Sequence, residues 1–172
     1  MKKYSFKEQI AMADLYEEKV IKYLRGIVNT LFVVDARKDA ACQVLDTDAI
    51  RVFLSGEKIE VESFEIKVDF KMNSTGNLFV EEGKKGWLEK TRADFIFYLD
   101  AISAEAYVIP LDRLKEYVKA NSAKLEKKTV STVDFGGYEV EGTLVPLKGL
   151  RDNVPVIIYD LNNLKDDDQP IT

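Results

Sequence analysis

Apolar residues recur at intervals of three and four positions near the N-terminus, a pattern that predicts an amphipathic helix. The apolar positions of this helix are Ile10, Ala13, Val20, Ile21, Leu24 and Val28. Ser5 and Glu8 have the spacing of a capping box, which predicts Ser5 as the N-cap. Glu17 falls on the apolar face, where an unpaired carboxylate is costly to bury. Glu17 therefore either reaches water from the edge of the apolar stripe or borders a polar site that needs its carboxylate.

Short apolar runs separated by turn residues follow the helix, and they predict strands. We expect strands over residues 31–34, 49–54, 58–61, 63–70, 78–80, 95–99 and 106–109. We expect polar connections over residues 37–42 and 73–76, a turn at Ser55-Gly56 and a basic loop over 83–86. The apolar run over 95–99 is typical of a buried strand, and the strand over 106–109 is expected to pair with it.

The last third of the chain predicts one more helix and further strands. Pro110 and Asp112 open a helix that runs to about Asn121. Its inward-facing positions are Leu114, Tyr117 and Val118. Beyond residue 129, the pair Gly136-Gly137 indicates a hairpin, and residues 154–159 indicate a strand.

Composition limits both the architecture and the chemistry. The chain has 172 residues, the size of one domain, and neither a repeat nor a composition shift marks a second one. We therefore expect one α/β domain over residues 1–165, with a mixed sheet flanked by helices, and an acidic, disordered tail over 166–172. There is no histidine and a single cysteine, Cys42, which excludes histidine-dependent catalysis, histidine-ligated metals and an internal disulfide.

The charge of the chain narrows the choice of partners. A net charge of −5 argues against a passive nucleic-acid binder, since such proteins usually carry a basic excess. A metal-dependent enzyme acting on nucleic acid remains compatible with it, because divalent ions bring positive charge to the site. Apolar stretches such as 95–99 are far shorter than the roughly 20 residues that span a bilayer. We therefore expect no membrane partner, and the polar helical spacing after Lys2 and Lys3 favours a cytoplasmic protein.

The residues with the clearest chemical potential lie between positions 44 and 70. Asp46 and Asp48 share the parity of the strand that follows them, so both are expected on one face of that strand. Glu65 and Lys67 share one face of the next strand, with about 6.5–7 Å of rise between them. If the two strands are neighbours, Asp48 and Glu65 converge on one cation beside Lys67. Two carboxylates suit Mg²⁺, with Mn²⁺ as its substitute, because Mg²⁺ binds through one or two carboxylates plus substrate phosphate.

The order of these motifs resembles that of the PD-(D/E)xK nuclease superfamily. Asp48, a hairpin and then Glu65-Ile66-Lys67 look like the signature of that superfamily. The segment from Glu17 to Leu24 is similar to the N-terminal helix of archaeal-type Holliday-junction resolvases, where a glutamate seven positions before a leucine joins the metal site. The segments over 76–81 and 86–94 are similar to a phage and bacterial branch of the superfamily.

The resemblance implies a restriction-endonuclease-like fold and a magnesium-dependent endonuclease that cleaves phosphodiester bonds in branched or duplex DNA. It implies that Asp48 and Glu65 hold the metal with help from Glu17. Lys67 would then orient the attacking water and offset the charge that develops on the phosphate. A homodimer is expected if both strands of a duplex are cut, because two-fold symmetry matches two sites to two strands.

Two assignments stay open at this stage. Thr47 stands where the superfamily has a proline before the first aspartate, which leaves Asp46 as a rival to Asp48. Glu81 is either a further carboxylate of the metal site or the exposed end of a strand.

Basic residues in the loops beside the proposed site are Lys71, Lys84, Lys85, Lys90 and Arg92. They form either a rim that grips DNA phosphates or ordinary solvated loop charges. Trp87 is either a base-stacking residue or a packing residue. The alternative to an enzyme is a non-catalytic binding or interaction module with a nuclease fold.

Overall fold

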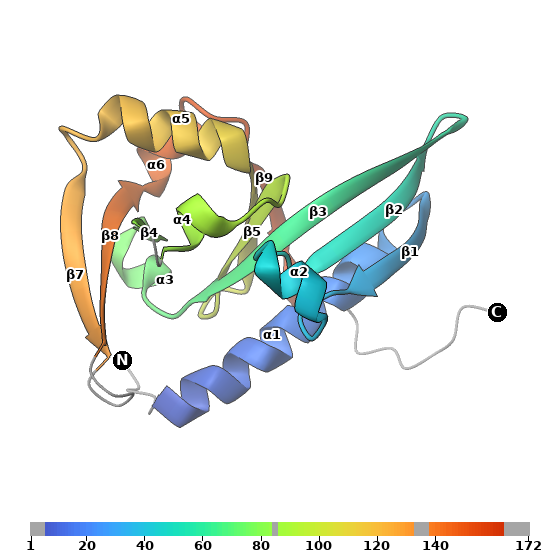
Figure 1. Ribbon diagram of the computed structural model, residues 1–172, viewed down its shortest axis with the longest axis horizontal. Coiled ribbons are helices and arrows are strands. Elements are labelled where there is room, and N and C mark those ends of the chain that lie inside the picture. The colour runs from blue at the N-terminus through green and yellow to red at the C-terminus, as the bar shows by residue number, and fades with distance from the viewer. Residues whose placement is uncertain (1–5, 84–85, 133–137, 164–172) are drawn as a thin grey trace.

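The N-terminal helix is present, but only its second half is buried. The computed structural model describes residues 6–83, 86–132 and 138–163, so the predicted N-cap Ser5 lies outside the described residues. Helix α1 spans Phe6–Gly26 and buries Val20, Ile21 and Leu24. Ile10 is 44% exposed and Val28, beyond the end of the helix, is 80% exposed. The predicted apolar stripe is therefore too long, because the first turns of α1 extend past the sheet that covers the later ones (Figure 1).

Six strands of the described part form a mixed sheet in the order β1-β2-β3-β5-β6-β9. Their bounds are Thr30–Asp35 for β1, Ala49–Ser55 for β2, Lys58–Asp69 for β3, Phe95–Asp100 for β5, Glu105–Pro110 for β6 and Ile157–Asp160 for β9. Strands β3 and β5 pair in parallel, and the remaining neighbours pair antiparallel. The predicted mixed α/β architecture and the pairing of β5 with β6 are confirmed.

Several local predictions differ from the structure. The two strands expected over 58–61 and 63–70 form the single strand β3, and the turn expected at Ser55-Gly56 lies one residue later, at Gly56 and Glu57. Within the predicted connection over 37–42, Asp39 caps a short helix, α2 (Ala40–Val44), by accepting from the backbone N–H groups of Ala41 and Cys42. Residues expected as a loop form α3 (Met72–Thr75), which ends at Gly76 with φ 67°. The last strand begins at Ile157 instead of 154. The predicted hairpin at 136–137 and the acidic tail lie outside the described residues.

The connection between the parallel strands β3 and β5 builds a second sheet, which the sequence pattern did not predict. A parallel pair needs a crossover, and here it contains α3, β4 (Asn77–Glu81) and α4 (Trp87–Lys90). Strand β4 pairs with β8 (Tyr138–Pro146), which pairs with β7 (Glu126–Thr132). The remaining elements are α5 (Leu111–Asn121), α6 (Leu147–Arg151) and the short helix η2 (Leu161–Asn163).

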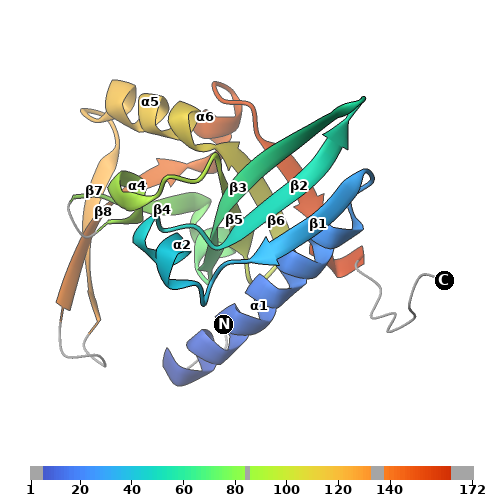
Figure 2. The same ribbon diagram turned by 45° about the vertical axis from the view of Figure 1, so that its right-hand side comes forward.

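Two apolar clusters cover the two faces of the central strands. On β5, Phe97 and Leu99 pack towards α1, whereas Ile96 and Tyr98 pack towards α4, α5 and the second sheet. Figures 1 and 2 show α1 on one side of the large sheet, with α5, α6 and the second sheet on the other. Burial on both faces explains why β5 is an uninterrupted apolar run. Leu114 and Val118 are buried on α5, as the sequence predicts.

The β1–β2–β3 end of the large sheet exposes an apolar face. Phe32, Val34, Leu54, Ile59 and Val61 lie there with 37–67% of their surface exposed. Helix α1 packs on the opposite face, and Figure 2 shows the second sheet away from this end of the large sheet. Among the described residues no helix is long and apolar enough to cross a membrane.

The Tyr98 hydroxyl joins the two sheets. It donates to Asp69 Oδ2 of β3 at 2.7 Å and accepts from the Phe79 N–H of β4 at 3.0 Å. Asp69 also accepts from the backbone N–H groups of Lys71 and Met72, which fixes the start of the crossover. One hydroxyl group thus links β4 directly to β3.

Tyr98→Phe should lower the free energy of unfolding by about 1–3 kcal/mol, because it leaves a partly buried N–H and a carboxylate oxygen without this partner. Tyr107→Phe is the matched control: Tyr107 pairs with Tyr98 across the sheet, but its hydroxyl donates only to Glu105 on the same strand. Urea denaturation of both variants measures the difference. Equal losses would contradict a bridging role for Tyr98.

Candidate functional site

Asp48 and Glu65 are brought together by the tight turn of the β2–β3 hairpin. Ser55 pairs with Lys58, and the ladder runs without a shift to Ala49 opposite Phe64. The next position of this register sets Asp48 beside Glu65. The Asp48 N–H donates to the Phe64 carbonyl at 2.9 Å, and the Ile66 N–H donates to Asp48 Oδ2 at 2.8 Å. Asp48 and Glu65 therefore lie next to each other, as the sequence predicts.

Glu65 has a buried carboxyl group, and one of its two oxygens lacks a hydrogen-bond donor in the described part of the chain. Its surface is 2% exposed, and it forms an ion pair with Lys67. Among the described residues its Oε2 atom has no hydrogen-bond partner. Burial raises the pKa of Glu65 to about 8; the negative charge of Asp48 adds to the rise, and Lys67 opposes it. A buried carboxylate oxygen without a partner is costly and is well suited to a cation.

Lys67 and Asp48 are electrostatically coupled to Glu65. Burial alone would lower the pKa of Lys67, but Glu65, Asp48 and Asp46 together raise it above its ordinary value. Burial raises the pKa of Asp48, although the Ile66 N–H and the Lys67 charge oppose this. Lys67 is thus held by an ion pair with Glu65 and by the negative charge of the two neighbouring aspartates.

Glu17 borders this cluster from α1, and it has a partner that the sequence pattern did not reveal. Arg37 Nη1 lies 3.3 Å from Glu17 Oε2, while the same guanidinium also binds Asp35. Burial raises the pKa of Glu17, the Arg37 hydrogen bond lowers it, and the charge of Asp48 raises it. Glu17 is thus partly exposed, paired with Arg37 and within electrostatic range of Asp48. It both reaches water from the edge of the apolar stripe and borders the polar cluster.

Asp46 and Asp48, the two candidates for the first metal ligand, differ in backbone position. Asp46 adopts a left-handed backbone conformation with φ 52°, and its carbonyl accepts from the Thr91 hydroxyl at 2.7 Å. It lies two residues further from β2 than Asp48, which the Phe64 carbonyl and the Ile66 N–H hold beside Glu65. Asp46 still contributes negative charge that acts on Asp48, Glu65 and Lys67.

Glu81 ends β4 and is partly buried instead of fully exposed. Burial raises its pKa, with Lys67 and Lys90 opposing the rise and Asp46 adding to it. Gly86 keeps this region tight, since a Cβ there would lie 2.5 Å from the Glu81 backbone. The second sheet therefore brings a further carboxylate within electrostatic range of Lys67.

The donor set fits one hard divalent cation with an incomplete protein shell. No group of three or more acidic, histidine or cysteine residues in the described part is arranged to hold a metal. Two neighbouring carboxylates, one of which has an unpartnered buried oxygen, suit Mg²⁺, which keeps several water ligands. Asp48 and Glu65 would hold such an ion, and the ion pair between Lys67 and Glu65 would have to break for the ion to bind.

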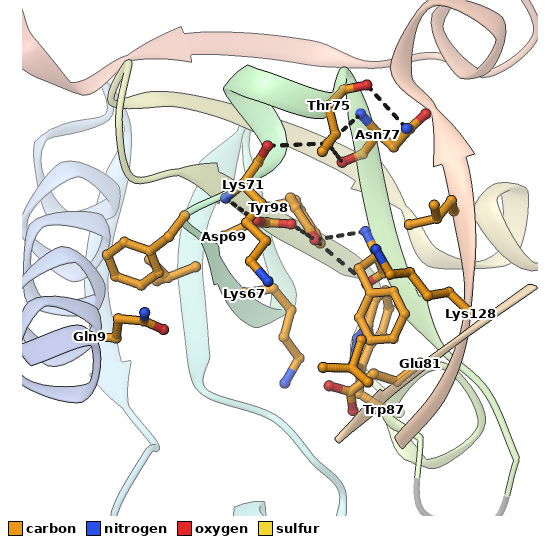
Figure 3. Close-up of a pocket in the computed structure, with 15 residues that line it drawn as sticks. Gln9, Lys67, Asp69, Lys71, Thr75, Asn77, Glu81, Trp87, Tyr98 and Lys128 are labelled. Carbon is orange, nitrogen blue, oxygen red and sulfur yellow. Dashed lines mark hydrogen bonds between the residues drawn. The ribbon is translucent and has the colours of Figure 1, made fainter. Parts of the chain in front are cut away.

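A cleft of about 270 Å³ adjoins Lys67 and Glu81. Its walls come from α1, the end of β3, β4 and the second sheet (Figure 3). Of the predicted basic residues, Lys71 lines the cleft and Lys90 lies near Glu81, whereas Arg92 lines a different depression beside α5. Lys84 and Lys85 lie outside the described residues.

The cleft also contains residues that the sequence pattern did not single out. Lys128 reaches it from β7, which is distant from the predicted site in sequence. Trp87 is 3% exposed and belongs to the apolar core, so the packing interpretation of this residue is confirmed. Its ring also lines the cleft, with Lys67 Nζ 5.9 Å from the ring centroid.

Comparison with protein-family models, curated proteins and solved structures finds no match for this chain. What the fold defines is a mixed α/β protein with a six-stranded and a three-stranded sheet in its described part.

Proposed function

We propose that this protein is a magnesium-dependent endonuclease that cleaves phosphodiester bonds in DNA, with a restriction-endonuclease-like fold. The observation that carries the proposal is the cluster of Asp48, directly before β2, with Glu65 and Lys67 of β3, the partner of β2 in the hairpin. The motif order that resembles the PD-(D/E)xK superfamily thus coincides with a spatial cluster. An ordinary solvated strand would leave Glu65 exposed and without pKa perturbation.

Asp48 and Glu65 bind the cation, and Glu17 supports the site from α1. When bound, Mg²⁺ activates a water molecule and stabilises charge on the scissile phosphate. Lys67 donates hydrogen bonds to the attacking water and offsets the developing negative charge. Arg37 pairs with the Glu17 carboxylate, which lies within electrostatic range of Asp48.

The chain also offers groups that would hold the DNA. Lys71, Lys90 and Lys128 place positive charge around an otherwise acidic site. Such contacts position a nucleic acid through its phosphates without reading its sequence. Cutting both strands of a duplex would involve a homodimer, whose two-fold symmetry matches two sites to two strands.

The direct test is nicking of supercoiled plasmid and cleavage of branched DNA with Mg²⁺ or Mn²⁺, and with chelator as the control. Metal-dependent products support the endonuclease. DNA binding without cleavage under either ion would instead support the non-catalytic nuclease-fold module. Failure both to bind and to cleave DNA would contradict both proposals.

A further inference from the structure

The cleft beside Lys67 has an apolar part that metal-dependent hydrolysis alone does not require. Its apolar lining includes Phe70, Phe79, Trp87, Val130 and Leu144, and we call this part of the cleft the aromatic pocket. Lys67 and Glu81 form part of the same wall, so the pocket opens directly beside the proposed catalytic lysine (Figure 3). At about 270 Å³ the cleft lies just below the range of about 300–1,000 Å³ typical of drug-sized ligands. It suits one planar group.

The wall that Phe79 provides is fixed by its neighbours on both sides. Gly142 of β8 lies under the ring, and a Cβ at this position would be 2.6 Å from ring atoms. The Phe79 N–H is held by the Tyr98 hydroxyl on the large sheet. The ring is therefore preorganised, which lowers the entropic cost of stacking a ligand on it.

Besides Lys67 and Glu81, which form the wall beside the proposed site, three charged residues line the cleft: Asp69, Lys71 and Lys128. Asp69 accepts three hydrogen bonds, from Tyr98 and from the N–H groups of Lys71 and Met72. It is therefore occupied by the fold. The lysines that line the cleft at its edges, Lys71 and Lys128, are exposed. An apolar interior with cationic edges complements a planar base that is attached to phosphates.

We propose that the aromatic pocket binds a single unpaired nucleobase of the DNA strand whose phosphate lies at Asp48 and Glu65. This inference rests on the proposed endonuclease and names its substrate class: DNA with unpaired nucleotides at a branch, bulge or flap. A base inside a continuous duplex enters only after unstacking and unpairing, which costs a few kcal/mol. An unpaired base avoids most of that cost and gains stacking on the ring of Phe79.

The test compares three DNA duplexes of the same length and sequence: one fully paired, one with a single bulged thymidine, and one with an abasic residue at the bulge. Fluorescence anisotropy in chelator measures binding to the wild-type protein, and cleavage with Mg²⁺ is measured separately. We expect the thymidine bulge to bind about 5- to 100-fold more tightly than the abasic bulge, the effect of stacking one base. We also expect it to be cleaved faster than the paired duplex.

Phe79→Ala should reduce this thymidine-to-abasic ratio to about one. The matched control is Phe32→Ala, an exposed phenylalanine at the far end of the large sheet, which should retain the wild-type ratio. Leu144→Trp, which fills the pocket from β8, is a second variant that should also abolish the preference. Circular dichroism verifies that each variant is folded.

The two proposals fail in different ways. Equal binding of the thymidine and abasic bulges by the wild-type protein overturns the base pocket, even if all three DNAs are cleaved. Preference for the thymidine bulge without any cleavage overturns the endonuclease and leaves the pocket as a base-binding site. A wild-type ratio retained in both Phe79→Ala and Leu144→Trp would also overturn the assignment of the pocket.

Discussion

Lys67→Gln is expected to lower the rate of DNA cleavage by about 10²- to 10³-fold, the loss seen when one preorganised electrostatic contact is removed. The ammonium of Lys67 lies between Glu65 and the cleft, where it can face both the attacking water and the phosphate. Glutamine keeps much of the side-chain length but has no charge to offset the transition state. Single-turnover cleavage measures the chemical step without product release.

The same variant should still bind metal and DNA. Lys67 is not a metal ligand, and its removal ends its competition for Glu65. DNA affinity should fall by about one phosphate contact. Lys58→Gln, an exposed lysine at the other end of β3, is the matched control and should cleave at the wild-type rate. A wild-type rate in Lys67→Gln would contradict the proposed mechanism.

Asp48→Asn should abolish the rise in melting temperature that Mg²⁺ produces in the wild-type protein. A ligand at a concentration 100 times its dissociation constant stabilises the native state by about 2.7 kcal/mol. For a chain of 172 residues this corresponds to a shift of about 5–10 °C. Asparagine can still accept the hydrogen bond from the Ile66 N–H, so the local fold should persist while the charge that binds the cation is lost. Differential scanning fluorimetry with and without Mg²⁺ measures the shift.

Two further variants make this result specific. Asp46→Asn should retain most of the shift, because Asp46 lies two residues further from β2 than Asp48, which the Phe64 carbonyl and the Ile66 N–H hold beside Glu65. Glu60→Gln, an exposed carboxylate on the same strand as Glu65, should retain all of it. A full shift in Asp48→Asn, combined with its loss in Asp46→Asn, would assign the metal to the rival aspartate.

The core of the candidate site follows from local sequence signals. A hairpin with a two-residue turn at Gly56 and Glu57 fixes its own register, so the separation of Asp48 and Glu65 along the chain already aligns them. The alternation of polar and apolar residues in β3 then turns Glu65 and Lys67 to one face. The buried strand β5 and the helix α5 were predictable for the same reason, because each pattern lies within a single element.

Other parts of the site depend on residues that are distant in sequence. Arg37 meets Glu17 only because β1 packs beside α1, and no periodicity in either segment encodes that contact. Strand β4 has an ordinary strand pattern, but its partner β8 lies far along the chain. The pairing of distant strands is selected by the packing of the whole chain, and a local pattern does not specify it.

By itself, the sequence predicted the mixed α/β class, the hairpin and, on the condition that its two strands are neighbours, the proximity of Asp48, Glu65 and Lys67. The tertiary structure decided the burial of Glu65, the pairing of Glu17, and the second sheet that brings Glu81, Phe79 and Lys128 around the cleft. The physical reason is the range of the interactions. Turn geometry and side-chain alternation act over a few residues, whereas burial and cleft shape arise only when distant elements exclude water together.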